Sequence, residues 1–166
     1  MDEKGTLIFF CGKMGAGKST LSQQRAYESR GILVSEDEWL KALYPEEIDN
    51  FDDYLKYSSR IKPLVKNHVQ AILRTGTTVV MDFPGNTVKQ RMWFKEVCAE
   101  HDIPLKLVYL DISDAQCLEH LKKRNISNPE RAKFDTEEIF KQVTSYFEPP
   151  MGNENLNIEV VNAKDA

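Results

Sequence analysis

Residues 12–20 have the composition and spacing of a loop that holds phosphate groups, Gly-x-x-x-x-Gly-Lys-Ser. Glycines adopt backbone conformations closed to other residues, so successive N–H groups can turn toward one anion. In such a loop the lysine, Lys18, reaches the β- and γ-phosphates of a nucleotide, and the next hydroxyl, of Ser19, ligates Mg²⁺. We therefore expect a nucleoside triphosphate site. The residues expected to line it are Gly12, Lys13, Met14, Gly15, Ala16, Gly17, Lys18, Ser19 and Thr20.

The segments on either side of this loop have the patterns that the loop requires. Residues 6–11 form a short apolar run rich in β-forming residues, which predicts a buried strand. Residues 18–29 contain neither Gly nor Pro, which predicts a helix whose positive amino end adds to the phosphate site. The alternative is an ordinary glycine turn that caps a helix.

The first acid of chemical interest is Asp37, which follows a second predicted strand at residues 32–35. Ser35 and Glu38 have the spacing of a capping box, so Asp37 is expected in the first turn of a helix. In open α/β sheets, ligands bind at this carboxyl edge. Asp37 could therefore accept the proton of an attacking hydroxyl, which is the base role in phosphoryl transfer. The alternative is an acid that complements the helix dipole.

A second acid, Asp82, ends the β-branched run at residues 77–82. An apolar strand that closes on an aspartate is typical of nucleotide-binding folds in which the carboxylate holds Mg²⁺ directly or through water. Many strands end in Asp, so the pattern gains weight only beside the glycine loop. We expect Asp82 to contact either the metal or the acceptor of the phosphoryl group.

Residues 124–135 are predicted to form a basic lid. A helix capped by Ser113 is expected to end at Arg124, and a polar, turn-rich segment follows before a helix capped by Asp135. Arg124 and Arg131 would close over the triphosphate and neutralise charge on the transferring group, and Arg124 would also contact the nucleotide. The alternative is a solvated basic helix end followed by a loop.

Three further segments have patterns that allow two interpretations. Residues 44–57 carry acids and aromatics, which indicates either a mobile flap over an acceptor or a surface excursion anchored to the core. In the helical pattern that follows, Pro63 predicts a kink or a late start. Arg91, about one turn into a helix expected over residues 87–101, could point at the site or form a surface salt bridge.

The alternation of strands and helices predicts the fold. It indicates one α/β domain over residues 1–166, a parallel sheet sandwiched by helices and joined by right-handed connections. The binding site is then expected along the carboxyl edge of the sheet. The expected strands are residues 6–11, 32–35, 77–82, 105–110 and 157–161.

Composition excludes several classes of protein. A chain of 166 residues can form one domain with a real core, and no apolar run approaches the length that spans a bilayer. Residues 1–4 are no secretory signal, and the three cysteines are expected as buried hydrophobes in a reducing compartment, so we expect a cytoplasmic protein. The net charge of −4 provides no general basic field for nucleic acid. The three histidines share no metal-ligand spacing.

With these motifs the chain resembles the small P-loop kinases, in particular the branch that contains phage-type polynucleotide kinase, zeta-toxin-like kinases, chloramphenicol phosphotransferase and gluconate kinase. The resemblance implies the sheet order 2-3-1-4-5, Asp37 as general base, Arg124 and Arg131 in a lid, and a turn at Glu148-Pro149 near adenine. It covers nearly the whole chain, and its specific parts are residues 12–20, 35–37 and 79–82, then Asn86 and Arg91, and residues 123–131.

The acceptor is the part on which the resemblance is least specific. Polynucleotide kinases carry an arginine three residues after the base, where this chain has Leu40. We therefore expect an ATP- and Mg²⁺-dependent phosphotransferase that acts on a hydroxyl of a small molecule, with no membrane and no obligate protein partner. One alternative is a 5′-hydroxyl nucleotide or polynucleotide kinase, and another is a nucleotide-binding regulatory module that transfers no phosphate.

Overall fold

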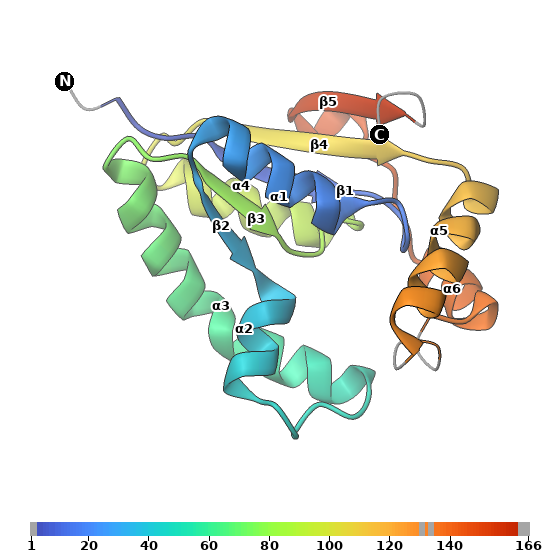
Figure 1. Cartoon of the computed structure of the whole chain (residues 1–166). Helices are drawn as coiled ribbons and strands as arrows, with labels where there is room; N and C mark the ends of the chain where they lie inside the picture. The colour runs from blue at the N-terminus through green and yellow to red at the C-terminus, as the bar shows by residue number, and fades with distance from the viewer. Residues whose placement is uncertain (1–2, 130–131, 133–134, 163–166) are drawn as a thin grey trace.

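A parallel sheet organises the chain (Figure 1). The computed structural model describes residues 3–129, 132 and 135–162. Within these residues five strands lie in the order β2-β3-β1-β4-β5, and all neighbouring strands are parallel. The predicted α/β fold and the strand order implied by the resemblance are confirmed. The strands are β1 (Leu7–Cys11), β2 (Ile32–Ser35), β3 (Val79–Asp82), β4 (Leu105–Asp111) and β5 (Asn157–Asn162).

Helices cover both faces of the sheet (Figure 1). Successive side chains of a strand point to opposite faces, so Phe9 packs with one set of helices and Phe10 with the other. The first set is α2, α3 and α4, and the second is α1, α5 and α6. Because both faces of the central strands β1 and β3 are buried, these strands are nearly continuous apolar runs. The helices are α1 (Lys18–Ser29), α2 (Glu36–Leu43), α3 (Phe51–Arg74), α4 (Val88–Ala99), α5 (Asp114–Ser127) and α6 (Glu137–Thr144), with a 3₁₀ turn, η2, at Gly152–Glu154.

Side-chain caps fix where several helices begin. The predicted cap of α2 is confirmed, since the Glu38 N–H donates to Ser35 Oγ at 3.4 Å. The predicted cap of α6 is wrong by one residue, because the Ile139 N–H donates to Thr136 Oγ1 at 3.1 Å. Helix α5 continues past Arg124 to Ser127, so Arg124 lies in its last turn and not at its end.

Helix α3 begins earlier than its proline suggests. Asn50 caps it by accepting the Asp53 N–H at 2.8 Å, and the helix runs through Pro63 without a late start. Pro63 and Ser59 are both exposed, so water can reach the Ser59 carbonyl that lacks a helical donor. The ring centres of Tyr44, just after α2, and Tyr57, in α3, lie 4.2 Å apart, and both side chains pack against the core, which confirms the anchored excursion.

Candidate active site

The glycine loop joins β1 to α1 at the carboxyl edge of the sheet. Gly15 and Gly17 have φ angles of 81° and 103°, in the left-handed region that favours glycine. A Cβ on Gly15 would lie 2.6 Å from the carbonyl oxygen of Cys117, so the loop packs directly on α5. His120 is also on α5, and its Nδ1 forms a hydrogen bond with the Gly15 carbonyl oxygen at 2.8 Å. Two independent contacts with α5 thus shape the middle of the loop.

Lys18 closes the loop on itself. Its Nζ donates to the Gly12 carbonyl oxygen at 2.6 Å, while the side chain is half-buried. Burial lowers the pKa of Lys18, and the nearby Arg124 guanidinium acts in the same direction, whereas Asp82 opposes it. The ammonium therefore lies over the glycine loop within electrostatic reach of Asp82 and Arg124, which is where the sequence predicts a phosphate-binding lysine.

The predicted metal ligands are in contact. Ser19 Oγ, in the first turn of α1, donates to Asp82 Oδ2, at the end of β3, across 3.0 Å. Burial raises the pKa of Asp82, while the Ser19 hydrogen bond and Lys18 lower it. A hydroxyl beside one carboxylate fits Mg²⁺, which prefers oxygen and is commonly bound through one or two carboxylates together with phosphate. Among the described residues no cluster of three or more His, Cys, Asp or Glu could hold a metal alone.

Asp37 lies at the same edge of the sheet as Asp82. Strands β2 and β3 are paired so that Ser35 lies opposite Asp82, and Asp37 follows two residues later in the first turn of α2. Its side chain is 69% exposed and pairs with Lys41 at 3.1 Å. The negative charge of Asp37 raises the pKa of Asp82, so the two carboxylates are within electrostatic reach. The structure thus brings together the two acids that the sequence singled out.

A buried acid next to Asp37 was missed by the sequence reasoning. The Glu36 carboxylate accepts hydrogen bonds from the Tyr54 hydroxyl and from Ser58 Oγ, the latter at 2.8 Å. Burial raises the pKa of Glu36, and these two hydrogen bonds oppose the increase. The contacts fix the start of α2 against α3. The four-residue spacing of Tyr54 and Ser58, which places both on one face of a helix, was the available signal.

Of the two arginines in the predicted lid, Arg124 lies in the described part of the chain. Arg124 donates through Nε to Asp135 Oδ2 at 2.9 Å, and the Asn125 side chain donates to the Asp135 carbonyl oxygen at 3.2 Å. Arg131 lies outside the described residues. The lid therefore stays a prediction, with Arg124 as its described cationic member near Lys18.

Arg91 takes neither of its two expected positions. It is fully buried and donates to both Glu154 carboxylate oxygens, at 2.8 Å through Nε and at 3.1 Å through Nη2. Nη1 donates to the Gly85 carbonyl oxygen at 3.0 Å. The hydrogen bonds from Arg91 lower the pKa of Glu154. This arginine holds η2 against the segment after β3 and has a structural role.

The segment before β5 lies beside the glycine loop. Lys13 Nζ lies 5.6 Å from the ring centre of Phe147 and also forms an ion pair with Asp114 at 2.6 Å. The Phe147 and Tyr109 ring centres are 6.3 Å apart. These contacts place an aromatic surface at the edge of the loop, close to the Glu148-Pro149 turn for which the resemblance implies a place near adenine.

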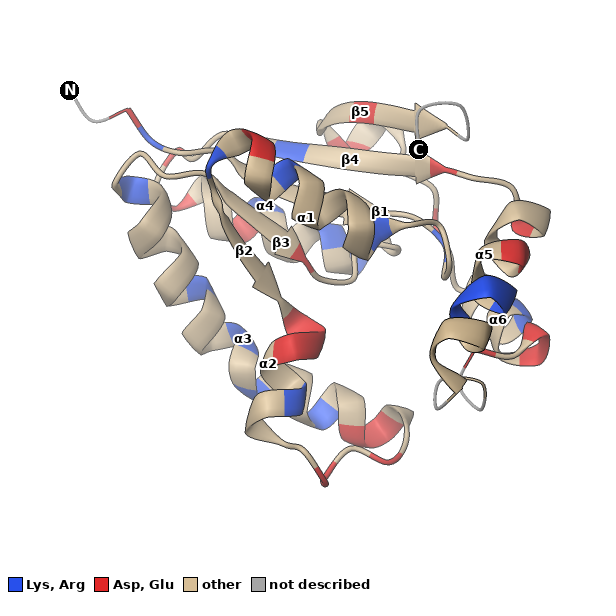
Figure 2. Ribbon diagram, viewed as in Figure 1, with Lys and Arg blue, Asp and Glu red and all other residues tan. Residues whose placement is uncertain are grey.

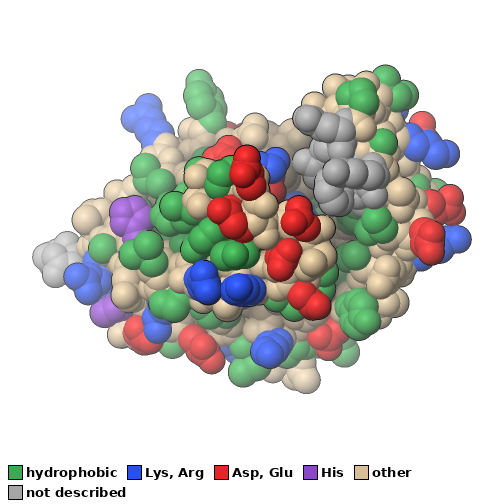
Figure 3. All heavy atoms as spheres, turned by 90° about the horizontal axis from the view of Figure 1, so that it is seen from below, with side chains coloured by type: hydrophobic (Ala, Val, Ile, Leu, Met, Phe, Trp, Pro, Cys, Tyr) green, Lys and Arg blue, Asp and Glu red, His purple; other side chains and the backbone are tan. Residues whose placement is uncertain are grey.

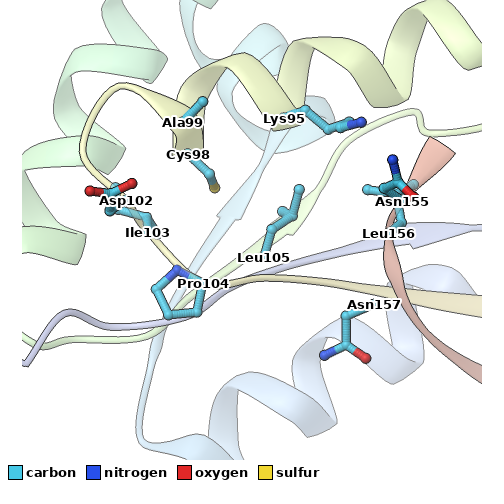
Figure 4. Close-up of a pocket in the computed structure, with 10 residues that line it drawn as sticks. All are labelled: Lys95, Cys98, Ala99, Asp102, Ile103, Pro104, Leu105, Asn155, Leu156 and Asn157. Atoms are coloured by element: carbon cyan, nitrogen blue, oxygen red, sulfur yellow. The ribbon is translucent and has the colours of Figure 1, made fainter.

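A separate cavity of about 390 Å³ lies at the opposite edge of the sheet. Its lining includes Leu105 and Asn157, which begin β4 and β5, and Cys98, near the end of α4 (Figure 4). Figure 4 shows the Leu105 side chain in the middle of this group and Lys95 extending toward Asn155. The cavity is distant in the fold from the glycine loop and is no part of the candidate site.

Comparisons with known proteins agree with this fold. The family model described as AAA domain matches residues 7–150. A search of the curated proteins finds no match. In the part of the chain that the structure describes, no helix has the length and apolar character needed to cross a membrane.

Several solved structures are similar over nearly the whole chain. APE1195 is 21% identical, with a TM-score of 0.66, and the match covers 99% of this chain and 88% of that chain. A sugar kinase from Janibacter sp. HTCC2649 is 14% identical, with a TM-score of 0.65 and coverage of 98% and 87%. The Mycobacterium tuberculosis APS kinase CysC, solved with AMPPNP and APS, is 16% identical, with a TM-score of 0.67 and coverage of 98% and 91%. Together with the glycine loop, these likenesses show a P-loop NTPase fold, and two of these three proteins are described as kinases.

Proposed function

The chain belongs to the AAA domain family, and we propose that it transfers the γ-phosphoryl group of ATP to a hydroxyl group of a small molecule. The proposal is carried by the contact between Ser19 and Asp82, 3.0 Å apart, with the Asp37 carboxylate within electrostatic reach. A hydroxyl, a metal-binding carboxylate and a second, exposed carboxylate at one sheet edge are the groups that phosphoryl transfer to an alcohol requires.

The nucleotide would bind along the glycine loop. The loop amides and the amino end of α1 would hold the phosphates, and Lys18 would exchange the Gly12 carbonyl for phosphate oxygens. Ser19 and Asp82 would hold Mg²⁺. Bound MgATP supplies the phosphoryl group and an electrophilic centre whose charge the metal partly neutralises. The chain itself contributes binding and orientation, which account for most of the catalysis in this chemistry.

Asp37 would orient the acceptor and take its proton. Its carboxylate is exposed and can reach an incoming hydroxyl, and Lys41 pairs with it at 3.1 Å. Arg124, on the other side of the loop, would face the transferring group and reduce its charge. The roles of Asp37 and Arg124 are thus separated in space, one on the acceptor side and one on the nucleotide side.

The surface on the acceptor side is acidic. Figure 2 shows acids on the first turns of α2 and α3 and on the connection between them, and Figure 3 shows acidic side chains gathered at this end of the molecule. A polynucleotide would be repelled by these charges. This surface supports a small molecule as the acceptor. The acids of the connection and of the start of α3 are Glu46, Glu47, Asp49, Asp52 and Asp53.

The test is a panel of small alcohols, sugars, nucleosides and 5′-hydroxyl oligonucleotides screened for acceptor-dependent ADP release. We expect Asp37→Asn to keep its ATP affinity and to lose transfer to the active acceptor. Asp52→Asn is the matched control, because Asp52 also lies in the first turn of a helix but at the start of α3. Transfer that persists in Asp37→Asn would remove Asp37 from the base role.

The same screen separates the two alternatives. Phosphorylation of the oligonucleotide alone would identify a polynucleotide kinase. ATP consumption that stays unchanged across the whole panel would favour a regulatory module. Failure of the wild-type protein to bind ATP at all would refute the proposed function.

A further inference from the structure

Asn86, in the segment after β3, contacts two parts of the chain that are distant in sequence. Its Oδ1 accepts the Gly12 N–H at 2.9 Å, at the start of the glycine loop. Its carbonyl oxygen accepts the Glu148 N–H at 2.8 Å, in the segment before β5. Its own N–H donates to Gln90 Oε1 at 2.8 Å, which ties it to α4. One residue thus joins the glycine loop, α4 and the segment before β5.

The same short segment holds both ends of the glycine loop. Asp82 receives a hydrogen bond from Ser19 at the carboxyl end of the loop, and Asn86 receives one from Gly12 at the amino end. Between them, Gly85 lies so close to β1 that a Cβ there would be 2.4 Å from the Phe10 carbonyl oxygen. Residues 82–86 therefore span the glycine loop as a clasp.

The two ends of this clasp have different chemistry. The carboxylate of Asp82 suits a cation, whereas the amide oxygen of Asn86 accepts a hydrogen bond without adding negative charge beside an anion site. A carboxylate at position 86 would repel phosphate. We propose that Asn86 is a positioning residue that fixes the Gly12 amide and thereby sets the affinity of the glycine loop for phosphate, independently of Mg²⁺. The inference rests on the proposed function in taking this loop as the nucleotide site.

The test measures the affinity for tripolyphosphate and for ATP by calorimetry, with Mg²⁺ and with EDTA. Asn86→Ala is expected to weaken binding of both ligands about tenfold in either condition, because the hydrogen bond that holds the Gly12 amide is lost. Asp82→Asn is expected to weaken binding only when Mg²⁺ is present. Asn67→Ala, at an exposed position of α3, is the matched control and is expected to bind as the wild type does.

A second variant keeps the test valid if Asn86→Ala fails to fold. Gln90→Ala removes the side chain that receives the Asn86 N–H and leaves the Gly12 contact in place, so it is expected to weaken both ligands less, in the same metal-independent way. Unchanged affinities in either folded variant, or a loss confined to Mg²⁺ conditions, would overturn the role of Asn86. A wild-type protein that binds neither ligand would instead refute the proposed function.

Discussion

The Ser19 hydroxyl donates to the Asp82 carboxylate across 3.0 Å, from the first turn of α1 to the end of β3. The two residues are 63 positions apart in the chain, and they meet because β1 and β3 are neighbouring parallel strands whose carboxyl ends share one edge. If these two oxygens bind Mg²⁺ as proposed, the contact already holds them side by side, and little reorganisation would be needed for the metal to bind between the protein and the phosphates.

Replacement of Asp82 by Asn is expected to remove the contribution of Mg²⁺ to ATP binding. The amide keeps the shape and can accept the Ser19 hydrogen bond, but it carries no charge for the metal. At a ligand concentration 100 times the dissociation constant, binding stabilises a protein by about 2.7 kcal/mol. We expect thermal unfolding to show most of the Mg²⁺-dependent part of this stabilisation lost in Asp82→Asn. Asp111→Asn, an exposed acid at the end of β4, is the control.

Lys18→Met is expected to lose ATP binding without a loss of stability in the unliganded protein at neutral pH. Burial lowers the pKa of Lys18, so the charged form costs free energy in the folded state. The folded protein then binds this proton less tightly than the unfolded chain does. Wild-type stability should therefore rise relative to that of Lys18→Met as pH increases from the lowered pKa toward 10.5.

Urea unfolding at pH 7 and at pH 10 measures this difference. A Lys18→Met protein that still binds ATP would show that the lysine does not reach the phosphates. Stability curves that remain parallel over this pH range would contradict the assigned effect of burial.

The fold could be predicted because its signals are local. The apolar runs of the strands, the cap at Ser35 and the glycine loop each lie within a few consecutive residues, and the pairing rules for parallel sheets supply the rest. Of the two expectations for Pro63, the late start is wrong, because the helix already begins at Phe51 and the Ser59 carbonyl that lacks a helical donor lies at an exposed position where water can reach it.

The supporting contacts of the site could not be predicted. Arg91 pairs with Glu154, and Asn86 with Gly12, across 63 and 74 positions respectively. A single sequence gives no sign of such pairs, because an arginine or asparagine near a helix start is equally compatible with solvent. The glycine loop can be recognised from the spacing of its residues. The residues that hold it in place are apparent only in the folded structure.

Glu36→Gln is expected to make the stability less dependent on pH. Because burial raises the pKa of Glu36 above 4.5, the folded state holds this proton more tightly than the unfolded chain. The stability that protonated Glu36 contributes is fully present below pH 4.5 and is lost as pH rises through the raised pKa. The Gln side chain should escape this loss because it cannot ionise. It can also still accept a hydrogen bond from Tyr54 or Ser58.

Urea unfolding of both proteins from pH 4 to pH 8 provides the comparison. We expect the stability of Glu36→Gln relative to the wild type to increase with pH. Glu47→Gln, an exposed acid between α2 and α3, should follow the wild type. A relative stability of Glu36→Gln that falls as pH rises would mean that the hydrogen bonds to the carboxylate outweigh its burial.

Arg124→Ala is expected to slow phosphoryl transfer on the order of 10³-fold, the lower range for arginines that stabilise the transferring phosphate. The ATP dissociation constant should change much less, because the charge that Arg124 neutralises develops in the transition state. Asp135→Asn is expected to slow transfer less, since it weakens the contact that holds Arg124 Nε and leaves the guanidinium itself in place. Lys122→Ala, at an exposed position of α5, serves as the control.

The double variant decides whether Asp135 acts through Arg124. If Asp135 only positions the guanidinium, adding Asp135→Asn to Arg124→Ala should slow single-turnover transfer no further. An additional loss equal to that of Asp135→Asn alone would show that the two residues act independently. Equal loss of ATP affinity and of rate in Arg124→Ala would place the arginine on the bound nucleotide in the ground state, because an interaction made only in the transition state leaves the dissociation constant unchanged.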